Sequence, residues 1–407
     1  MRVAVLVADS NGCYPVPASK DGAVSTLIES LIRTNSDAGK VDFTVVSYYD
    51  KEALALSEKY KNVDFIWIKT SFVTRLLDKI AFKGIKLLFR KKKALSFKSV
   101  FSLLSYIRQS AKILKKNYFD KVVLENNVPL AWTIKLSKYS GEFYYHFHNI
   151  PRLDAKCREV FEKCTAYLCV SGFVGSCITS DESAIGKIPE EKIRVLYNCI
   201  DTRRFKKAVG LDTAVIKEKY GVSPDEKIVI FVGRLSAEKG ILELLEAAKL
   251  MTYKNFRVMI VGSYLHNINE KDEYQQKLHN VACELGDKII FTGYVNQTDL
   301  PVLYNISDVA VLPSMWDEPA GLTMVEAMAC GVPVITTASG GIPEYMGDAA
   351  VVLRRDDRLI QNIALKTDEI LYASDKQKEA LIEKGAERVR ENFNTDIYLD
   401  RFKEALK

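Results

Sequence analysis

The chain has 407 residues, 48% of them hydrophobic and 27% charged, and a formal net charge of +6. This length predicts two domains, each long enough to bury its own core, and the composition excludes an intrinsically disordered protein. The charge is uneven, because residues 69–98 hold ten Lys/Arg and one Asp, a net +9, which leaves −3 for the rest of the chain.

Three features bear on the compartment. The first residues, MRVAVLVA, are predicted to be a buried strand and not a signal peptide. No apolar run approaches the roughly 20 residues that a membrane-spanning helix needs. The eight cysteines form no CxxC pair, and their spacing does not match a zinc site. We therefore expect reduced thiols in a cytoplasmic protein that requires no metal.

Strand-like and helix-like stretches alternate along the chain, which predicts parallel sheets covered by helices on both faces. The first half contains strands at 2–8, 42–49, 63–68, 121–126, 142–149, 166–171 and 192–198, and helices such as 23–34 and 99–116. After a looser stretch at 203–226, strands follow at 227–233, 256–262, 288–295, 309–314 and 333–337, with helices at 237–251, 273–286, 297–307 and 321–331. The predicted fold class is α/β, with two doubly wound, Rossmann-like domains facing each other across a deep cleft.

Ligands of such sheets bind beyond the carboxyl ends of the strands, so the residues that follow each strand are the candidates for a binding site. The segment SKDGAVSTLIESLI, 19–32, comes after the first strand and its loop. Gly22 would let backbone N–H groups approach a phosphate at the start of a helix. The segment is neither GxGxxG nor a Walker sequence, which argues against a dinucleotide site or a P-loop.

The basic window 69–98 alternates apolar and cationic residues at helical spacing. A helix with one apolar and one cationic side is typical of binding to anionic membrane surfaces, which is the partner we favour. A solvated basic face is the alternative. Nucleic acid is disfavoured, because interleaved aromatic residues and a known binding motif are missing.

Two histidines occur in YYHFHNI, 144–150. His146 and His148 are two residues apart on a predicted strand, so they face the same side near its carboxyl end. A metal pair would need a third ligand, and none is evident in the sequence. The sharper hypothesis is one histidine next to the reacting part of a bound substrate, and the alternative is a packed, hydrogen-bonded histidine.

The segment FVGRLSAEKGI, 231–241, places cations directly after a strand. Gly233 lets the backbone approach a ligand, and Arg234 and Lys239 follow in a short loop that opens a helix. A guanidinium, an ammonium and a helix N-terminus together suit a diphosphate. The alternative is an ordinary loop with two solvated cations.

Two acids lie in the apolar stretch WDEPAGLTMVEAMACGVPVI, 316–335. A helix is predicted from about Leu322 to Gly331, which places Glu318 in the preceding loop and Glu326 about one turn inside the helix. Carboxylates are rarely buried without partners. The pair therefore suits the vicinal hydroxyls of a ribose and a hexose, and the alternative is a capping acid plus a surface glutamate.

At these motifs the sequence resembles the family-4 glycosyltransferases of GT-B fold, of the bacterial surface-polysaccharide type. The motifs are the E-x7-E segment 318–326, GRLSAEKG, LYNCIDTRRF (196–205) and GGIPEYM (340–346), in the family's order. The resemblance implies a retaining transferase that moves a hexose from a nucleotide sugar, expected to be a UDP-sugar. It also implies an N-terminal acceptor domain at 1–205, a donor domain at 206–390, and a helix at 391–407 that returns to the first domain.

The resemblance further implies roles for individual residues. Arg234 and Lys239 would bind the donor diphosphate and stabilise the leaving group, Glu318 would contact the donor sugar, and Glu326 would hold the ribose. His148 matches the family's active-site histidine. Backbone groups that would help to seat the donor are those of Gly22, Ala320, Gly321 and Leu322.

The sequence departs from the family at Asp21, which replaces the first glycine of a Gly-Gly pair, at Cys199, which replaces a glycine, and at Ala320, which replaces a common Phe. An acid near a diphosphate is unfavourable. The donor half is therefore the firmer part of the resemblance.

These observations predict a peripheral enzyme at the inner face of the plasma membrane. Its partners would be a nucleotide-sugar donor and a lipid-linked glycan acceptor, with membrane contact through 69–98, no nucleic acid, no metal and no other cofactor. A transferase acting on a soluble acceptor and a degenerate, catalytically inactive partner subunit are the alternatives.

Overall fold

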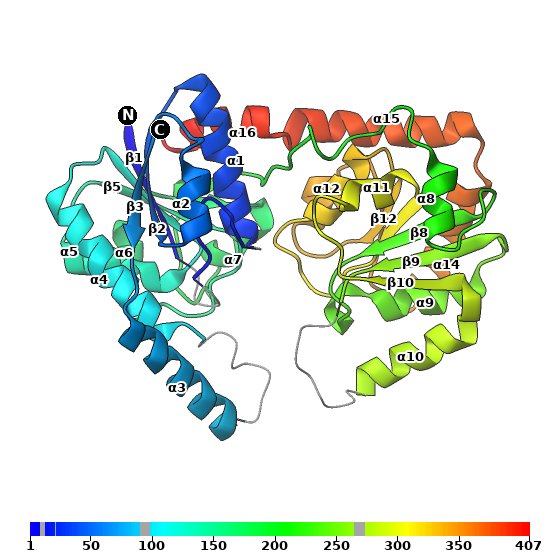
Figure 1. Cartoon of the computed structure of the whole chain (residues 1–407), viewed down its shortest axis with the longest axis horizontal. Coiled ribbons are helices and arrows are strands. Elements are labelled where there is room, and N and C mark those ends of the chain that lie inside the picture. The colour runs from blue at the N-terminus through cyan, green and yellow to red at the C-terminus, as the bar shows by residue number, and fades with distance from the viewer. Residues whose placement is uncertain (9–12, 21, 90–97, 264–272) are drawn as a thin grey trace. The chain divides into compact units, whose positions relative to one another are not determined.

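A computed structural model describes residues 1–8, 13–20, 22–89, 98–263 and 273–407. The chain divides into two compact units (Figure 1). The first comprises Met1–Asn198 together with Thr395–Lys407, and the second comprises Cys199–Asn394. The boundaries expected from the sequence, after 205 and after 390, differ from these by a few residues.

The described residues of the first unit form a seven-stranded parallel sheet in the order β3-β2-β1-β4-β5-β6-β7. The strands are β1 (Arg2–Val7), β2 (Asp42–Tyr48), β3 (Val63–Ile68), β4 (Lys121–Glu125), β5 (Glu142–Phe147), β6 (Ala166–Cys169) and β7 (Ile193–Val195). The helices are α1 (Ala23–Ala38), α2 (Lys51–Ser57), α3 (Phe72–Phe89), α4 (Val100–Lys116), α5 (Ala131–Ser137), α6 (Arg158–Lys163), α7 (Gly172–Thr179) and α16 (Thr395–Ala405), with short 3₁₀ turns at Val128–Leu130 and Glu190–Lys192.

The second unit forms a six-stranded parallel sheet from its described residues, in the order β10-β9-β8-β11-β12-β13. Its strands are β8 (Lys227–Val232), β9 (Phe256–Val261), β10 (Ile289–Gly293), β11 (Val309–Leu312), β12 (Val334–Thr337) and β13 (Val351–Leu353). Its helices are α8 (Thr213–Lys219), α9 (Ile241–Leu250), α10 (Glu273–Leu285), α11 (Leu300–Asn305), α12 (Leu322–Ala329), α13 (Ile342–Met346), α14 (Leu359–Tyr372) and α15 (Asp375–Asn392), with 3₁₀ turns at Ala237–Lys239 and Gly286–Lys288.

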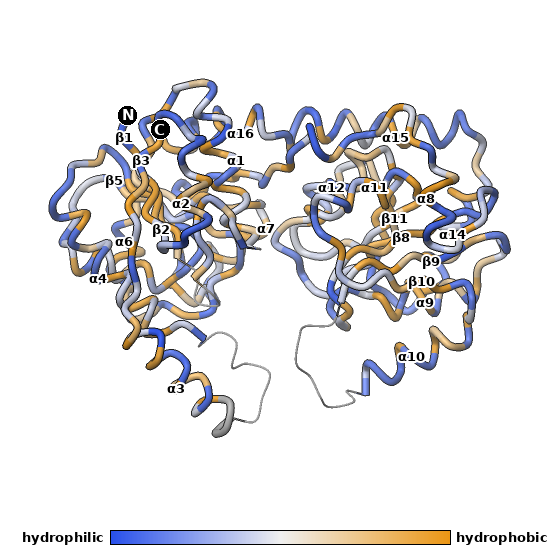
Figure 2. Tube along the Cα trace, in the orientation of Figure 1, coloured by the Kyte–Doolittle hydropathy of each residue, from blue (hydrophilic) through white to orange (hydrophobic). Residues whose placement is uncertain are grey.

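The central strands of both sheets are hydrophobic along most of their length (Figure 2). In β1 and β8 four or more consecutive residues are buried, as expected for strands covered by helices on both faces. The sheet order in each unit is that of a doubly wound Rossmann-like fold. The predicted α/β class with two such domains is confirmed.

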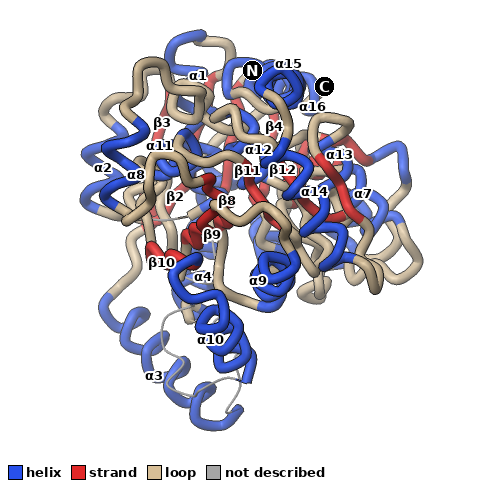
Figure 3. The backbone as a smooth tube through the Cα atoms, turned by 90° about the vertical axis from the view of Figure 1, so that its right-hand side faces the viewer, coloured by secondary structure: helices blue, strands red, loops and turns tan. Residues whose placement is uncertain are grey.

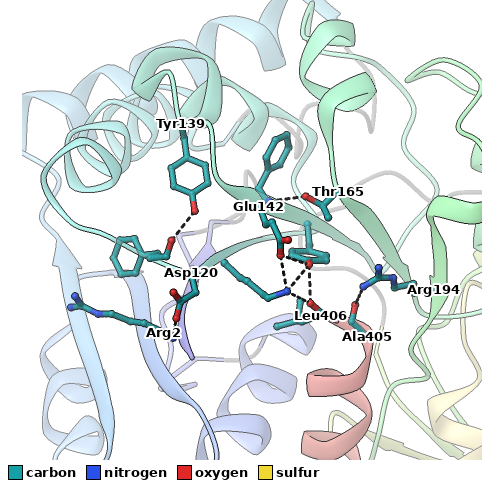
Figure 4. Close-up of polar contacts among 12 residues, drawn as sticks. Arg2, Asp120, Tyr139, Glu142, Thr165, Arg194, Ala405 and Leu406 are labelled. Carbon is teal, nitrogen blue, oxygen red and sulfur yellow. Dashed lines mark hydrogen bonds and ion pairs between the residues drawn. The ribbon is translucent and has the colours of Figure 1, made fainter.

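The C-terminal helix α16 packs on α1 of the first unit. Its last residues lie at the amino ends of the strands (Figure 4), where the Ala405 carbonyl accepts a hydrogen bond from Arg194 at 2.7 Å and the Leu406 carbonyl accepts one from Tyr144 at 2.8 Å. Lys121 donates to the same Leu406 carbonyl. These bonds hold Ala405 and Leu406 near the amino ends of the strands. Parallel sheets of this kind bind ligands at the opposite, carboxyl ends of their strands.

Helix α3 extends beyond the rest of the first unit (Figures 1 and 3). Its inward face carries Asp78, which is 7% exposed and accepts hydrogen bonds from the backbone N–H groups of Phe101 and Ser102 at the start of α4. No helix among the described residues is long and apolar enough to cross a membrane.

Candidate functional site

The donor-side residues predicted from the sequence lie at the switch point of the second sheet. Strands β8 and β11 are neighbours, and the chain leaves them towards β9 on one side and β12 on the other. Gly233 directly follows β8, and Ser314 lies two residues after the end of β11. The two loops are joined, because the Met315 N–H donates to the Glu238 carbonyl at 2.9 Å. This is the place where open parallel sheets bind ligands.

Glycine is required where these loops approach each other most closely. Gly240 has a φ of 70°, and a Cβ there would collide with the carbonyl of Pro313. Gly340 has a φ of 58°, and a Cβ there would meet the backbone of Asp317 and Glu318. The next residue, Gly341, donates its N–H to the Glu318 carbonyl at 2.7 Å. The GGIPE segment therefore fixes the backbone of the loop that carries Glu318.

Lys239 and Glu318 form an ion pair with each other. The Glu318 carboxylate also accepts a hydrogen bond from the Ser314 hydroxyl at 3.0 Å. Both side chains are largely covered, with 24% of Lys239 and 13% of Glu318 exposed. The sequence predicted both residues as ligand contacts but not their contact with each other, since 79 positions separate them.

Arg234 lies on the same loop but outside this pair. The side chain of Arg234 is 49% exposed, and its guanidinium lies 3.7 Å from the carboxylate of Glu238, four residues further along the chain. Such an exposed pair contributes little to stability, so the Arg234 side chain can move to another partner at small cost.

Glu326 lies on α12, which begins at Leu322 as predicted. Only 7% of Glu326 is exposed. Burial raises its pKa to about 8, although a hydrogen bond with Gln297 and the charge of Arg204 act in the opposite direction. Neither residue was assigned a role from the sequence: Arg204 lies in the LYNCIDTRRF motif, and both are too distant in the chain from Glu326 for the sequence to show the contact.

Ala320 and Gly321 lead into the same helix. Gly321 is its N-cap and provides no side-chain hydrogen bond to the first turn. Gly22 has the same position before α1, also without a side-chain cap. The first N–H groups of a helix have no partner within the helix, and a phosphate is a suitable one. Asp21, the departure from the family pattern, lies outside the described residues.

In the first unit, Glu125, His146 and His148 form a buried cluster at the carboxyl ends of β4 and β5. A carboxylate oxygen of Glu125 lies 3.1 Å from Nδ1 of His146 and 3.0 Å from Nε2 of His148. The two rings are close neighbours, with centroids 4.1 Å apart. The sequence predicted that both histidines face the same side, and both contact Glu125. The third group that was not evident in the sequence is this glutamate, which the structure brings to them from β4.

The electrostatics of this cluster are set by burial and by the proximity of the three groups. Burial opposes ionisation of Glu125, but the two histidines outweigh it and lower its pKa to about 2. Burial lowers the pKa of His148 to about 4, helped by His146. The three ligating atoms lie within 4.8 Å of one another, so the cluster has the donor types that suit a divalent metal. That the protein requires no metal stays a prediction.

Comparison with known proteins places the chain in a family. Residues 212–388 match the family described as "Glycosyl transferases group 1". The spore coat protein SA of Bacillus subtilis is 30% identical over 304 residues, which cover 69% of this chain and 78% of that protein. The chain belongs to the group 1 glycosyltransferases.

Other relatives of this glycosyltransferase differ in how much they share with it. The lipopolysaccharide 1,2-N-acetylglucosaminetransferase of Salmonella typhimurium is 29% identical over 296 residues, 70% of this chain and 72% of that protein. The matches span between 48% and 78% of the length of the first curated relatives. Anabaena HepE, solved in complex with UDP-glucose, is 18% identical with a TM-score of 0.69 over 100% of this chain and 99% of that one, which shows a shared fold.

Proposed function

We propose that this glycosyltransferase moves a hexose from a UDP-sugar to a glycan acceptor with retention of the anomeric configuration. The observation that carries the proposal is the Lys239–Glu318 pair at the switch point of the second sheet. It combines a cation for a diphosphate with a carboxylate for sugar hydroxyls. The UDP-glucose bound by a protein of the same fold supports the choice of donor.

In this mechanism donor binding separates the pair. Lys239, joined by Arg234, would turn to the diphosphate and stabilise the negative charge that develops as the glycosidic bond breaks. Glu318 would then accept hydrogen bonds from the hexose, and Glu326 from the ribose. The acceptor oxygen would attack on the face that the diphosphate leaves, and the departing phosphate would take its proton. His148 is the residue of the first unit that we expect to contact the reacting sugar.

Calorimetric titration of the whole chain with UDP, GDP and a panel of their sugars tests the proposal. We expect one uridine compound to bind and the matching UDP-sugar to be turned over by the enzyme. Binding of GDP alone would overturn the choice of donor. If no nucleotide binds, the partner-subunit alternative replaces the transferase.

We further propose that the acceptor is lipid-linked and that the enzyme serves surface polysaccharide synthesis at a membrane. The support comes from α3, whose outer face exposes apolar side chains with between 41% and 80% of their surface in solvent. They are Phe72, Val73, Leu76, Leu77 and Ile80. Arg75, Lys79 and Lys83 are also exposed on this helix, whereas its acid Asp78 is turned inward. Lys91, Lys92 and Lys93 of the same basic window lie outside the described residues.

Reversing the charges of α3 should release the enzyme from anionic vesicles. The Arg75→Glu/Lys79→Glu/Lys83→Glu variant loses three cations, each worth about 1 kcal/mol near an anionic surface, so vesicle affinity should fall by roughly 100-fold or more. Sedimentation with phosphatidylglycerol-containing vesicles measures this loss.

The matched control is Lys112→Glu/Lys115→Glu/Lys116→Glu, which changes the same charge at exposed positions of α4. An equal loss in both triple variants would show that net charge and not α3 decides binding. If the wild-type chain does not bind the vesicles, a soluble acceptor is favoured.

A further inference from the structure

Glu125 occupies a special position in the first sheet. It ends β4, which pairs with β1 at the point where the strand order reverses. Its register partners are Val7 on one side and His146 on the other. Glu125 is only 1% exposed. Burying a carboxylate is costly unless hydrogen bonds compensate for it, so its contacts explain why the fold tolerates it there.

The carboxylate of Glu125 contacts two imidazole rings. Its Oε2 lies 3.0 Å from Nε2 of His148 and 3.1 Å from Nδ1 of His146, and its Oε1 lies 3.3 Å from the same Nδ1. A carboxylate oxygen accepts hydrogen bonds, so each ring nitrogen that faces it must carry a proton. The backbone of His148 is held from the same strand end, because its N–H donates to Oδ1 of Asn126 at 3.0 Å.

This arrangement decides which nitrogen of His148 can accept a hydrogen bond. A neutral imidazole carries one proton, on one of its two ring nitrogens. Because that proton is on Nε2, Nδ1 is the bare nitrogen. The side chain of Asn198 also hydrogen-bonds His148, and Nδ1 is the ring nitrogen left to Asn198 or to a substrate hydroxyl.

We propose that Glu125 is a positioning residue that holds His148 in its Nε2–H tautomer, so that Nδ1 accepts a hydrogen bond from a hydroxyl of the reacting sugar. The inference rests on the proposed function, in which His148 contacts the sugar. It makes His148 an acceptor towards the substrate and not a donor or a cation. A carboxylate that orients the ring of a functional histidine is a common device in enzymes.

The first test is the tautomer itself. The chain has four histidines, so histidine-selective ¹⁵N labelling gives a simple two-bond ¹H–¹⁵N spectrum, and His148→Asn identifies the signals of His148. We expect a protonated Nε2 and a bare Nδ1. A protonated Nδ1 would overturn the proposal. So would a stoichiometric divalent metal that Glu125→Leu releases, because the cluster would then be a metal site.

The second test uses variants of Glu125 in the whole enzyme. Glu125→Leu removes the acceptor and should lower kcat by about 10–100-fold with little change in KM, while the His148 spectrum shows loss of the Nε2–H preference. Glu125→Gln keeps one acceptor oxygen and should restore most of kcat and the wild-type tautomer. Unchanged kcat in Glu125→Leu would overturn the proposal.

Glu142→Gln is the matched control. Glu142 begins β5, at the end of the strand opposite to the histidines, where it accepts a hydrogen bond from Lys121 at 2.7 Å. It should leave kcat and the His148 spectrum unchanged. The two proposals fail separately: a wild-type chain that transfers no sugar refutes the function, whereas the tautomer is read from the spectrum without any substrate.

Discussion

A Lys239→Ala variant should transfer sugar about 10²–10³-fold more slowly than the wild type, which is the effect of losing one group aimed at developing negative charge. The structure makes Lys239 the better covered of the two loop cations, since 24% of its side chain is exposed against 49% of Arg234. A charge in a partly desolvated position interacts more strongly with a leaving diphosphate than one in water. Arg234→Ala should therefore cost less than Lys239→Ala in kcat. Initial rates with saturating UDP-sugar measure both.

The same substitution leaves Glu318 without its cation, so a loss of folding must be separated from a loss of chemistry. Lys239→Ala/Glu318→Gln removes both charges of the pair. If the lysine acts on the diphosphate, Lys239→Ala stays slow even where thermal unfolding shows it to be fully folded, and the double variant, which also lacks the carboxylate proposed to contact the hexose, is at least as slow. If the lysine only stabilises the loop, Lys239→Ala unfolds at a lower temperature, the double variant regains that stability, and the rate per folded molecule of Lys239→Ala equals that of the wild type, so the proposed role is wrong. Lys249→Ala is the control, because Lys249 lies at the far end of α9 and pairs with Glu246 and Glu284.

The fold was predictable because its strands are short apolar runs between amphipathic helices. Each strand of the first sheet was found within a few residues of its predicted range. The elements absent from the prediction include helix α8 (Thr213–Lys219), which lies in the stretch expected to be loose, and others near the C-terminus. Strand β13 is only three residues, Val351–Leu353, too short for a periodic signal. Helix α15 has a strongly polar sequence and buries little more than Gly385 and Val389, so its apolar face is narrow.

The site was predictable only where one motif lies on one loop. The strand–loop–helix around Gly233 and the loop before α12 were located correctly, because glycine, charge and strand end occur together in the sequence. The ion pair between the two loops could not be predicted, because it depends on β8 and β11 being neighbours. Glu125 was missed for the same reason. An acid that ends an apolar strand is a signal, but only the pairing of β4 with β5 turns it towards the histidines.

Nucleotide binding should become tighter as the pH rises towards 8, and Glu326 should be the cause. Its pKa is about 8 because the side chain is buried, so at pH 7 most molecules carry a neutral Glu326. Ribose hydroxyls donate hydrogen bonds, which favour the ionised carboxylate, so binding must release a proton. Between pH 6 and 8 the affinity should rise by up to about tenfold per pH unit and then level off, since one pKa unit corresponds to about 1.4 kcal/mol.

Calorimetry of UDP binding in buffers of different ionisation enthalpy measures the number of protons that are released per nucleotide bound. In the wild type about one proton should leave per nucleotide at pH 7, as follows from a pKa of about 8. Glu326→Gln should release none and give a flat pH profile, with binding weaker than the wild type by about 1–3 kcal/mol at pH 8 and above, the cost of a lost charged hydrogen bond. Glu246→Gln, on α9 and paired with Lys249, should keep the wild-type profile.

A pH-dependent affinity that persists in Glu326→Gln would assign the proton to another group and would contradict the proposed contact between Glu326 and the ribose. A flat wild-type profile would mean that the carboxyl group stays protonated when the nucleotide is bound, and that it then donates a hydrogen bond instead of accepting one.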